Sequence, residues 1–184
     1  MAKQSTATIY QIKITLKGSK PPIWRRVLVH SDVTLEKLHY IIQDAMGWTN
    51  SHLHQFIVGG TYYGESHPDY GLDDMIDERR MRLEEIASEG DKFIYEYDFG
   101  DSWEHVVLVE KVLEPETGQR YPVCIKGKRA CPPEDVGGVW GYEEFLETIR
   151  DPDHPDHEEY LEWVGDDFDP EAFDLEETND LLHR

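Results

Sequence analysis

The sequence predicts an α+β fold: a mixed or antiparallel sheet with a β-grasp-like ββαββ first half, followed by a helical C-terminal part. Before residue 64, strand-like and helix-like segments follow one another in the order strand, strand, helix, strand, strand. A further strand pair surrounds residues 98–102, and acidic helical segments make up the end of the chain. With 184 residues, 39% of them hydrophobic, the chain can bury one substantial core. We therefore expect a single domain over residues 1–184.

The first three elements follow from their apolar spacing. Residues 8–16 alternate in polarity, which is typical of a half-buried strand, and residues 23–29 return as a second strand after a turn with glycine and proline. Thr34 can cap a helix over residues 35–46, whose apolar positions fit a 3.6-residue period. Gly47 suits the left-handed conformation that ends such a helix.

Two further hairpins are predicted. The first joins strands at residues 52–58 and 61–63 through Gly59-Gly60, a dipeptide that favours a tight turn of the primed type. Residues 65–78 are rich in Asp and Gly and predict an exposed loop, before a short strand at 81–83 and a helical turn through Ile86. The second hairpin pairs residues 92–97 with 103–113, so residues 1–116 are mainly sheet with one long helix.

The remainder of the chain divides into two parts. Residues 117–138 hold both cysteines and a Pro-Pro pair, and predict an ordered loop. Residues 139–184 form an acidic helical part with expected helices at 142–149 and 155–164, and a last helix opened by the capping box Asp174–Glu177.

The net charge of −21 is unevenly distributed. Residues 1–31 contain six bases and no acid, residues 117–133 contain bases only, and residues 134–184 contain nineteen acids against two arginines, a net of −17. An acidic protein repels phosphate, so a large nucleic-acid footprint is disfavoured unless the two basic stretches meet on one face. No signal sequence or membrane-length apolar segment is visible, and we expect a cytoplasmic protein.

The segment from Tyr95 to His105 is the most unusual in the chain. A turn explains its aspartates and Gly100, which can adopt a positive φ, but not Trp103 and His105 on one strand face. A pocket with aromatic walls and polar groups at its mouth would suit a small ligand or a metal ion. The alternative is that the aromatic side chains of this segment anchor the core. The candidate ligand-binding residues are Tyr97, Asp98, Asp101, Trp103, His105, Trp24, Arg25 and Arg26.

A divalent metal ion is the one cofactor that the sequence suggests. His52 and His54 lie two residues apart on a predicted strand, where both imidazoles can converge on one ion, although packing or solvent exposure is the simpler alternative. Cys124 and Cys131 are too far apart for a zinc knuckle and would need His52, His54 or His105 as additional ligands. The alternative is two buried structural thiols, and the neighbouring bases favour thiolate.

A second acidic cluster surrounds His154 and His157, close to the N-terminus of a predicted helix. Carboxylates at a helix N-terminus are favoured by the helix dipole, so capping explains most of the cluster. A pair of histidines beside carboxylates can also hold a divalent ion.

Five longer motifs together resemble one known family. They are Pro22-Ile-Trp-Arg-Arg26, Gly47-Trp48 with Ser51-His-Leu-His-Gln-Phe56, the segment from Tyr95 to His105, Arg129-Ala-Cys-Pro-Pro-Glu-Asp-Val-Gly-Gly138 with Gly141-Tyr142, and Phe168-Asp-Pro-Glu-Ala-Phe173. In this order, they resemble the proteins similar to the third open reading frame of an Agrobacterium Ri plasmid. The resemblance implies occurrence on plasmids, mobile elements and chromosomes, where some relatives are named passenger or TnpR-like proteins of insertion elements. It implies no specific activity.

Three functions are compatible with these observations. We favour a non-enzymatic binding or adaptor module, whose aromatic and acidic groove engages a protein or a small ligand, because common phosphate-loop, nucleophile-elbow and zinc-protease motifs are absent. The second is a metal-dependent hydrolase or nuclease-like enzyme that uses Asp98, Asp101 and His105 with His52 and His54. The third is a nucleic-acid accessory protein, for which the basic residues would be Arg25, Arg26, Lys126, Lys128 and Arg129.

Overall fold

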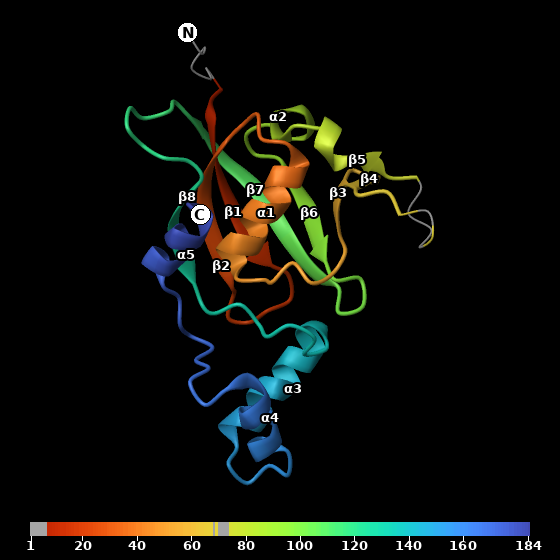
Figure 1. Cartoon of the computed structure of the whole chain (residues 1–184), viewed down its shortest axis with the longest axis vertical. Coiled ribbons are helices and arrows are strands. Elements are labelled where there is room, and N and C mark those ends of the chain that lie inside the picture. The colour runs from red at the N-terminus through yellow and green to blue at the C-terminus, as the bar shows by residue number, and fades with distance from the viewer. Residues whose placement is uncertain (1–6, 68, 70–73) are drawn as a thin grey trace.

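The computed structural model describes residues 7–67, 69 and 74–184, which form an eight-stranded mixed sheet in the order β5-β4-β3-β6-β7-β1-β2-β8 with five α-helices (Figure 1). The strands are β1 Ile9–Leu16, β2 Trp24–His30, β3 His54–Val58, β4 Thr61–Gly64, β5 Ile76–Asp77, β6 Lys92–Tyr97, β7 Trp103–Leu113 and β8 Val123–Lys128. The helices are α1 Leu35–Met46, α2 Leu83–Ile86, α3 Gly138–Arg150, α4 His157–Val164 and α5 Leu175–Leu182, with a 3-10 turn η2 at Glu78–Arg80. The predicted α+β class is confirmed, and the sheet is mixed because β4 and β5 run parallel.

The ββαββ order of the first half is confirmed, but its two hairpins do not lie side by side as in a β-grasp. The hairpin β6–β7 separates them, with β6 paired to β3 and β7 paired along the whole of β1. The eleven-residue β7 offers a partner as long as β1, and such a long-range pairing leaves no local pattern in the first half of the sequence.

Helix α1 has the predicted ends and lies across one face of the sheet (Figure 1). The Thr34 side chain accepts the backbone N–H of Lys37, and Gly47 ends the helix at φ 111°. Its apolar face, which includes Leu35, Leu38 and Ile42, is fully buried in the core. The predicted primed turn at Gly59-Gly60 is also confirmed, since both residues have positive φ.

Residues 117–138 are not wholly the ordered loop that the sequence predicts, because they contain strand β8. The strand pairs antiparallel with β2 at one edge of the sheet. Its other edge is covered by α5, where the Asn179 side chain accepts the N–H of Cys124 and donates to its carbonyl. Three of its six residues are Lys or Gly, so the apolar alternation that predicts a strand is missing.

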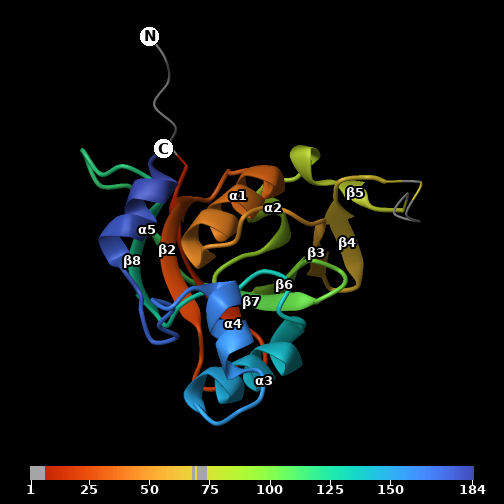
Figure 2. The same ribbon diagram turned by 60° about the horizontal axis from the view of Figure 1, so that its bottom comes forward.

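The three predicted C-terminal helices are present. Helices α3 and α4 pack on each other beyond one end of the sheet, whereas α5 returns to β8 and α1 (Figures 1 and 2). The predicted cap of α5 is confirmed, since the Asp174 side chain accepts the N–H of Glu177. The predicted loop at 65–78 lies partly outside the described residues, and its described end holds β5 and the start of η2.

A glycine fixes the start of α3 against the preceding loop and gives a first prediction. A Cβ at Gly141 would collide with the carbonyl oxygen of Val136 and lie 2.9 Å from its carbonyl carbon. We expect Gly141→Ala to lower the free energy of unfolding by about 2 kcal/mol, measured by urea denaturation, because backbone must shift. Helix propensity alone predicts that Gly141→Ala raises the free energy of unfolding by about 1 kcal/mol, so an increase in stability would contradict the steric argument. The exposed substitution Glu147→Ala in the same helix serves as the control and should change stability by less than about 0.5 kcal/mol.

Candidate metal centre

The turn between β6 and β7 is held by Asp98, with a different backbone from the one that the sequence predicts. Positive φ values occur at Asp98 (62°) and Ser102 (55°), not at Gly100. One carboxylate oxygen of Asp98, Oδ1, accepts the N–H groups of Gly100 at 3.0 Å and Asp101 at 3.4 Å. The Asp101 carboxylate accepts the N–H of Gly137 and so connects the turn to α3. These bonds leave the second oxygen of Asp98 free to face another residue.

Trp103 and His105 belong to the core and do not line an open groove. Both are fully buried, together with Tyr95 and Tyr97. His105 Nε2 accepts the indole N–H of Trp48 at 3.1 Å, and its Nδ1 donates to the carbonyl of Tyr95 at 3.1 Å. Burial lowers the pKa of His105 to about 4, so the ring is neutral at neutral pH. The structure therefore places His105 as a satisfied core histidine, outside the group of converging ligand atoms at His52, Asp98 and Asp135.

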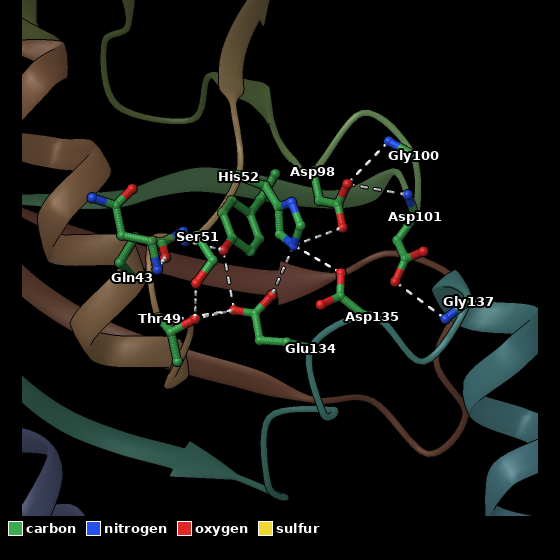
Figure 3. Close-up of polar contacts among 12 residues, drawn as sticks. Gln43, Thr49, Ser51, His52, Asp98, Gly100, Asp101, Glu134, Asp135 and Gly137 are labelled. Carbon is green, nitrogen blue, oxygen red and sulfur yellow. Dashed lines mark hydrogen bonds and ion pairs between the residues drawn. The ribbon is translucent and has the colours of Figure 1, made fainter.

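Three carboxylates surround the Nε2 atom of His52 (Figure 3). The distances are 2.8 Å to Asp135 Oδ1, 3.5 Å to Asp98 Oδ2 and 3.9 Å to Glu134 Oε2. None of the three meets the geometry of a hydrogen bond, and both His52 Nε2 and Glu134 Oε2 are shielded from solvent. The imidazole nitrogen therefore points into a cluster of carboxylate oxygens without forming a hydrogen bond to any of them.

The cluster is held in place through the atoms that do not face His52. Glu134 Oε1 accepts the Thr49 N–H at 2.9 Å, the Thr49 hydroxyl at 3.1 Å and the Tyr97 hydroxyl at 3.1 Å (Figure 3). Tyr97 in turn accepts the Ser51 N–H, and burial raises its pKa, so it stays a donor. Asp98 and Glu134 thus each use one oxygen for the fold and present the other to His52.

The backbone at Asp135 also favours this arrangement. Its φ of 62° is uncommon for a residue other than glycine, and its carboxylate faces His52. In the part of the chain that the structure describes, His52, Asp98 and Asp135 are the one group of three His, Cys, Asp or Glu residues whose ligand atoms all lie within 4.8 Å of one another. Two ligand atoms bound to one tetrahedral zinc ion are about 3.4 Å apart. This value lies between the 2.8 Å from His52 Nε2 to Asp135 and the 3.5 Å from His52 Nε2 to Asp98.

His54 does not join His52, contrary to the sequence interpretation. Its Nε2 lies 2.7 Å from Glu78, both side chains are nearly buried, and its ring stacks on His39 at 3.4 Å. The reason is that β3 begins only at His54, so His52 lies in the preceding loop and the alternation of a strand does not relate the two rings. His39 is itself neutral, because burial and the nearby His54 lower its pKa to about 3.

The two cysteines are free thiols and take no part in the cluster. Burial raises the pKa of Cys124 and, more strongly, of Cys131. The expectation that neighbouring bases favour thiolate is therefore wrong, because desolvation outweighs their charge. The histidines of the second acidic cluster serve helix ends: His157 Nδ1 bonds to the carbonyl of Thr148, and His154 Nδ1 accepts the N–H of Asp156.

Three of the five basic residues suggested for nucleic-acid binding, Arg25, Arg26 and Arg129, are engaged within the fold, whereas Lys126 and Lys128 are exposed. The buried guanidinium of Arg25 donates to four backbone carbonyls and stacks on Phe173. Arg26 forms a two-bonded pair with Glu110, and the Trp24 ring lies beneath Arg26 and Lys13. Arg129 is also buried and bonds to Pro21 and Glu171. The two basic stretches do meet where β2 pairs with β8, with Arg26 opposite Lys126, and the three arginines there make contacts within the fold.

The sequence interpretation missed Glu134 and Asp135. They follow Pro132-Pro133 in a loop, 82 and 83 residues after His52, and no local spacing relates them to a histidine. The signal that points to them is the dense motif of residues 129–138, which is longer than a structural turn requires. The close contact between the loops is formed by tertiary structure alone.

Comparisons with known proteins give one consistent result. A sequence model described as "Plasmid pRiA4b ORF-3-like protein" matches residues 8–177. "Uncharacterized protein y4hQ" of Sinorhizobium fredii (strain NBRC 101917 / NGR234) is 42% identical over 176 residues, which is 94% of this chain and 90% of that protein. A crystal structure of the protein of unknown function MM3350 from Methanosarcina mazei Go1 is 40% identical, with a TM-score of 0.87 over 94% of this chain and 98% of the other. None of the described helices is long and apolar enough to cross a membrane.

Proposed function

Because the chain belongs to the plasmid pRiA4b ORF-3-like family, whose relatives named above are uncharacterised, we propose its function from the site: a binding module that holds a divalent metal ion at His52, Asp98 and Asp135. One observation carries the proposal: the Nε2 atom of His52 faces three carboxylate oxygens and has no hydrogen-bond partner. Glu134 supplies the third oxygen, either as a fourth ligand or as a neighbouring charge.

The charge of the cluster favours a cation. Three carboxylates around one imidazole carry two negative charges even when His52 is protonated, and their shared position is more stable with a divalent ion between them. Imidazole and carboxylate ligands together suit zinc or manganese, whereas all-oxygen sites suit magnesium and calcium. We therefore expect zinc to bind more tightly than manganese, and manganese more tightly than magnesium.

An open side of the site leaves room for a ligand. The Asp135 side chain is 66% exposed and the His52 side chain 29% exposed. His52 also lines a cavity of about 520 Å³ together with Ser51, His54 and Glu78. A metal ion with three protein ligands and an open position can bind a further group, which is how the module would engage a small molecule or a side chain of a partner.

The test is a zinc titration of the chelator-treated full chain by isothermal titration calorimetry. We expect one ion per chain, and at least a 100-fold weaker affinity in His52→Ala and in Asp135→Asn, because the first removes the imidazole ligand and the second replaces a carboxylate by a neutral amide. His154→Ala is the matched control, since it removes a histidine from an acid-rich surface that lacks converging ligand atoms. Equal affinity in His52→Ala, or an affinity lost in His154→Ala, would exclude the site.

A further inference from the structure

The groove between α3 and α4 combines aromatic rings with carboxylates. It forms a cavity of about 340 Å³ with Phe145 on α3, Tyr160 and Trp163 on α4, and the acids Asp135 and Glu159. Gly141 also lines the groove and adds no side chain to fill it. The volume is within the range of small-ligand sites, at roughly 300 Å³ and above.

The three aromatic rings of the groove lie next to one another, with Phe145 beside both Tyr160 and Trp163. Tyr160 and Trp163 lie three residues apart on α4, so they project from the same side of the helix. The centroid of the Phe145 ring is 5.8 Å from that of Tyr160 and 5.9 Å from that of Trp163, with interplanar angles of 35° and 78°. Phe145 is buried and Trp163 is 51% exposed, so one wall of the groove faces solvent.

The charges around the groove select its occupant. An apolar group that filled it would remove water from the Glu159 carboxylate and from the exposed side of Asp135, whose Oδ1 faces His52, and this desolvation is unfavourable. An anion would face the same carboxylates and the net charge of −17 over residues 134–184. A cation with an apolar surface satisfies both the rings and the acids, because the face of an aromatic ring attracts positive charge.

We propose that this groove binds an organic cation with a methylated ammonium head, held over Trp163, Tyr160 and Phe145 and neutralised by Asp135 and Glu159. A methylated ammonium is rounder and less hydrated than a primary ammonium or a flat guanidinium, so it fits between rings that meet at a steep angle. The head group can come from a free small molecule or from a methylated lysine side chain.

The proposal does not depend on the metal ion, although Asp135 borders both sites. The two can be separated because His52 is not among the residues that line the groove, and Trp163 is not among the residues with converging ligand atoms. In chelator-treated protein, His52→Ala should lose zinc binding and retain cation binding, whereas Trp163→Ala should do the opposite.

The experiment is a titration of the full chain with choline by calorimetry, in the presence of chelator. We expect saturable binding that is at least about tenfold weaker for the neutral isostere 3,3-dimethylbutan-1-ol, because the isostere has the same shape without the charge. Trp163→Ala should weaken choline binding at least about tenfold, and Glu159→Gln should weaken it less. Trp140→Ala is the matched control: Trp140 is 83% exposed on α3 outside the groove, and its loss should leave the affinity within twofold.

A second arm of the same experiment distinguishes the two sources of the head group. A peptide with trimethyllysine that binds at least tenfold more tightly than choline would assign the site to a modified protein, and equal affinities would assign it to a free small molecule. Circular dichroism checks that each variant is folded. Equal binding of the isostere, unchanged binding in Trp163→Ala, or no binding by choline or the peptide would overturn the proposal.

Discussion

Lowering the pH from 6.5 to 4.5 is expected to reduce the free energy of unfolding by about 5 kcal/mol, a large share of the stability of a typical domain. The cause is the pair of buried histidines His39 and His105. Burial lowers their pKa values to about 3 and about 4, well below the ordinary histidine value of about 6.5. Each unit of pKa difference corresponds to about 1.4 kcal/mol.

The sign follows from proton uptake. Well above pH 6.5 both rings are neutral in the folded and the unfolded chain, and they add no pH dependence. Between pH 6.5 and 4.5 the unfolded chain takes up protons that the folded chain does not, so stability falls as the pH falls. Glu110 and Asp77, whose pKa values are lowered by arginine partners, act at lower pH because ordinary carboxylates titrate near pH 4.

Urea denaturation at several pH values, in the presence of chelator, measures this effect. His105→Gln retains an acceptor for the Trp48 indole and cannot be protonated, so the slope of stability against pH should decrease by about one proton. His183→Gln, which changes a partly exposed histidine, is the control for the loss of a histidine as such. If the free energy of unfolding has the same slope against pH in His105→Gln and in the original chain, His105 is not a cause of the loss of stability in acid.

Replacing Arg25 by alanine is expected to lower the free energy of unfolding by about 3 to 5 kcal/mol. The guanidinium donates to the carbonyls of Ala45 and Met46, the last residues of α1, and of Trp24 and Lys128. Arg25 therefore satisfies carbonyls at the C-terminal end of α1 and joins this helix to β8. Each buried carbonyl that loses its donor costs about 1 to 3 kcal/mol, and the lost packing on Phe173 adds to this.

The neighbouring residue supplies a matched control. Arg26 lies on the same strand and pairs with Glu110, but both side chains are about one-fifth exposed, so Arg26→Ala should cost about 1 kcal/mol or less. If Arg25→Ala does not fold, Arg25→Lys can be measured in its place. Lysine keeps the charge but cannot reach four carbonyls, so this variant should still lose about 2 kcal/mol or more of its free energy of unfolding. Similar midpoints of urea unfolding for Arg25→Ala and Arg26→Ala would show that the buried network contributes little.

Much of the fold was predictable because its signals are local. The hairpin β6–β7 and helix α1 have the predicted bounds, since alternation and the 3.6-residue period depend on neighbouring residues only. Strand β8 was missed because edge strands tolerate charge and glycine, and the order of the strands was missed because pairing over long distances leaves no local pattern.

The candidate site was predicted in part. His52, Asp98 and Tyr97 were recognised, whereas Glu134 and Asp135 were not. Trp103 and His105 were recognised as more than a turn requires, and both belong to an aromatic core in which His105 is hydrogen-bonded through both ring nitrogens. Arg25 was interpreted as a basic contact residue, because a sequence does not show which charges are buried.

The sequence by itself determined the α+β class, the bounds of the hairpin β6–β7 and of helix α1, the family, and the segments in which chemistry is concentrated. Only the tertiary structure decided which of those residues meet. It brought His52 beside Asp98 and Asp135 and turned His54 towards Glu78, since three loops far apart in the sequence converge at one end of the sheet. Local periodicity is encoded within a few neighbouring residues, whereas a site depends on contacts that form only when distant segments pack together.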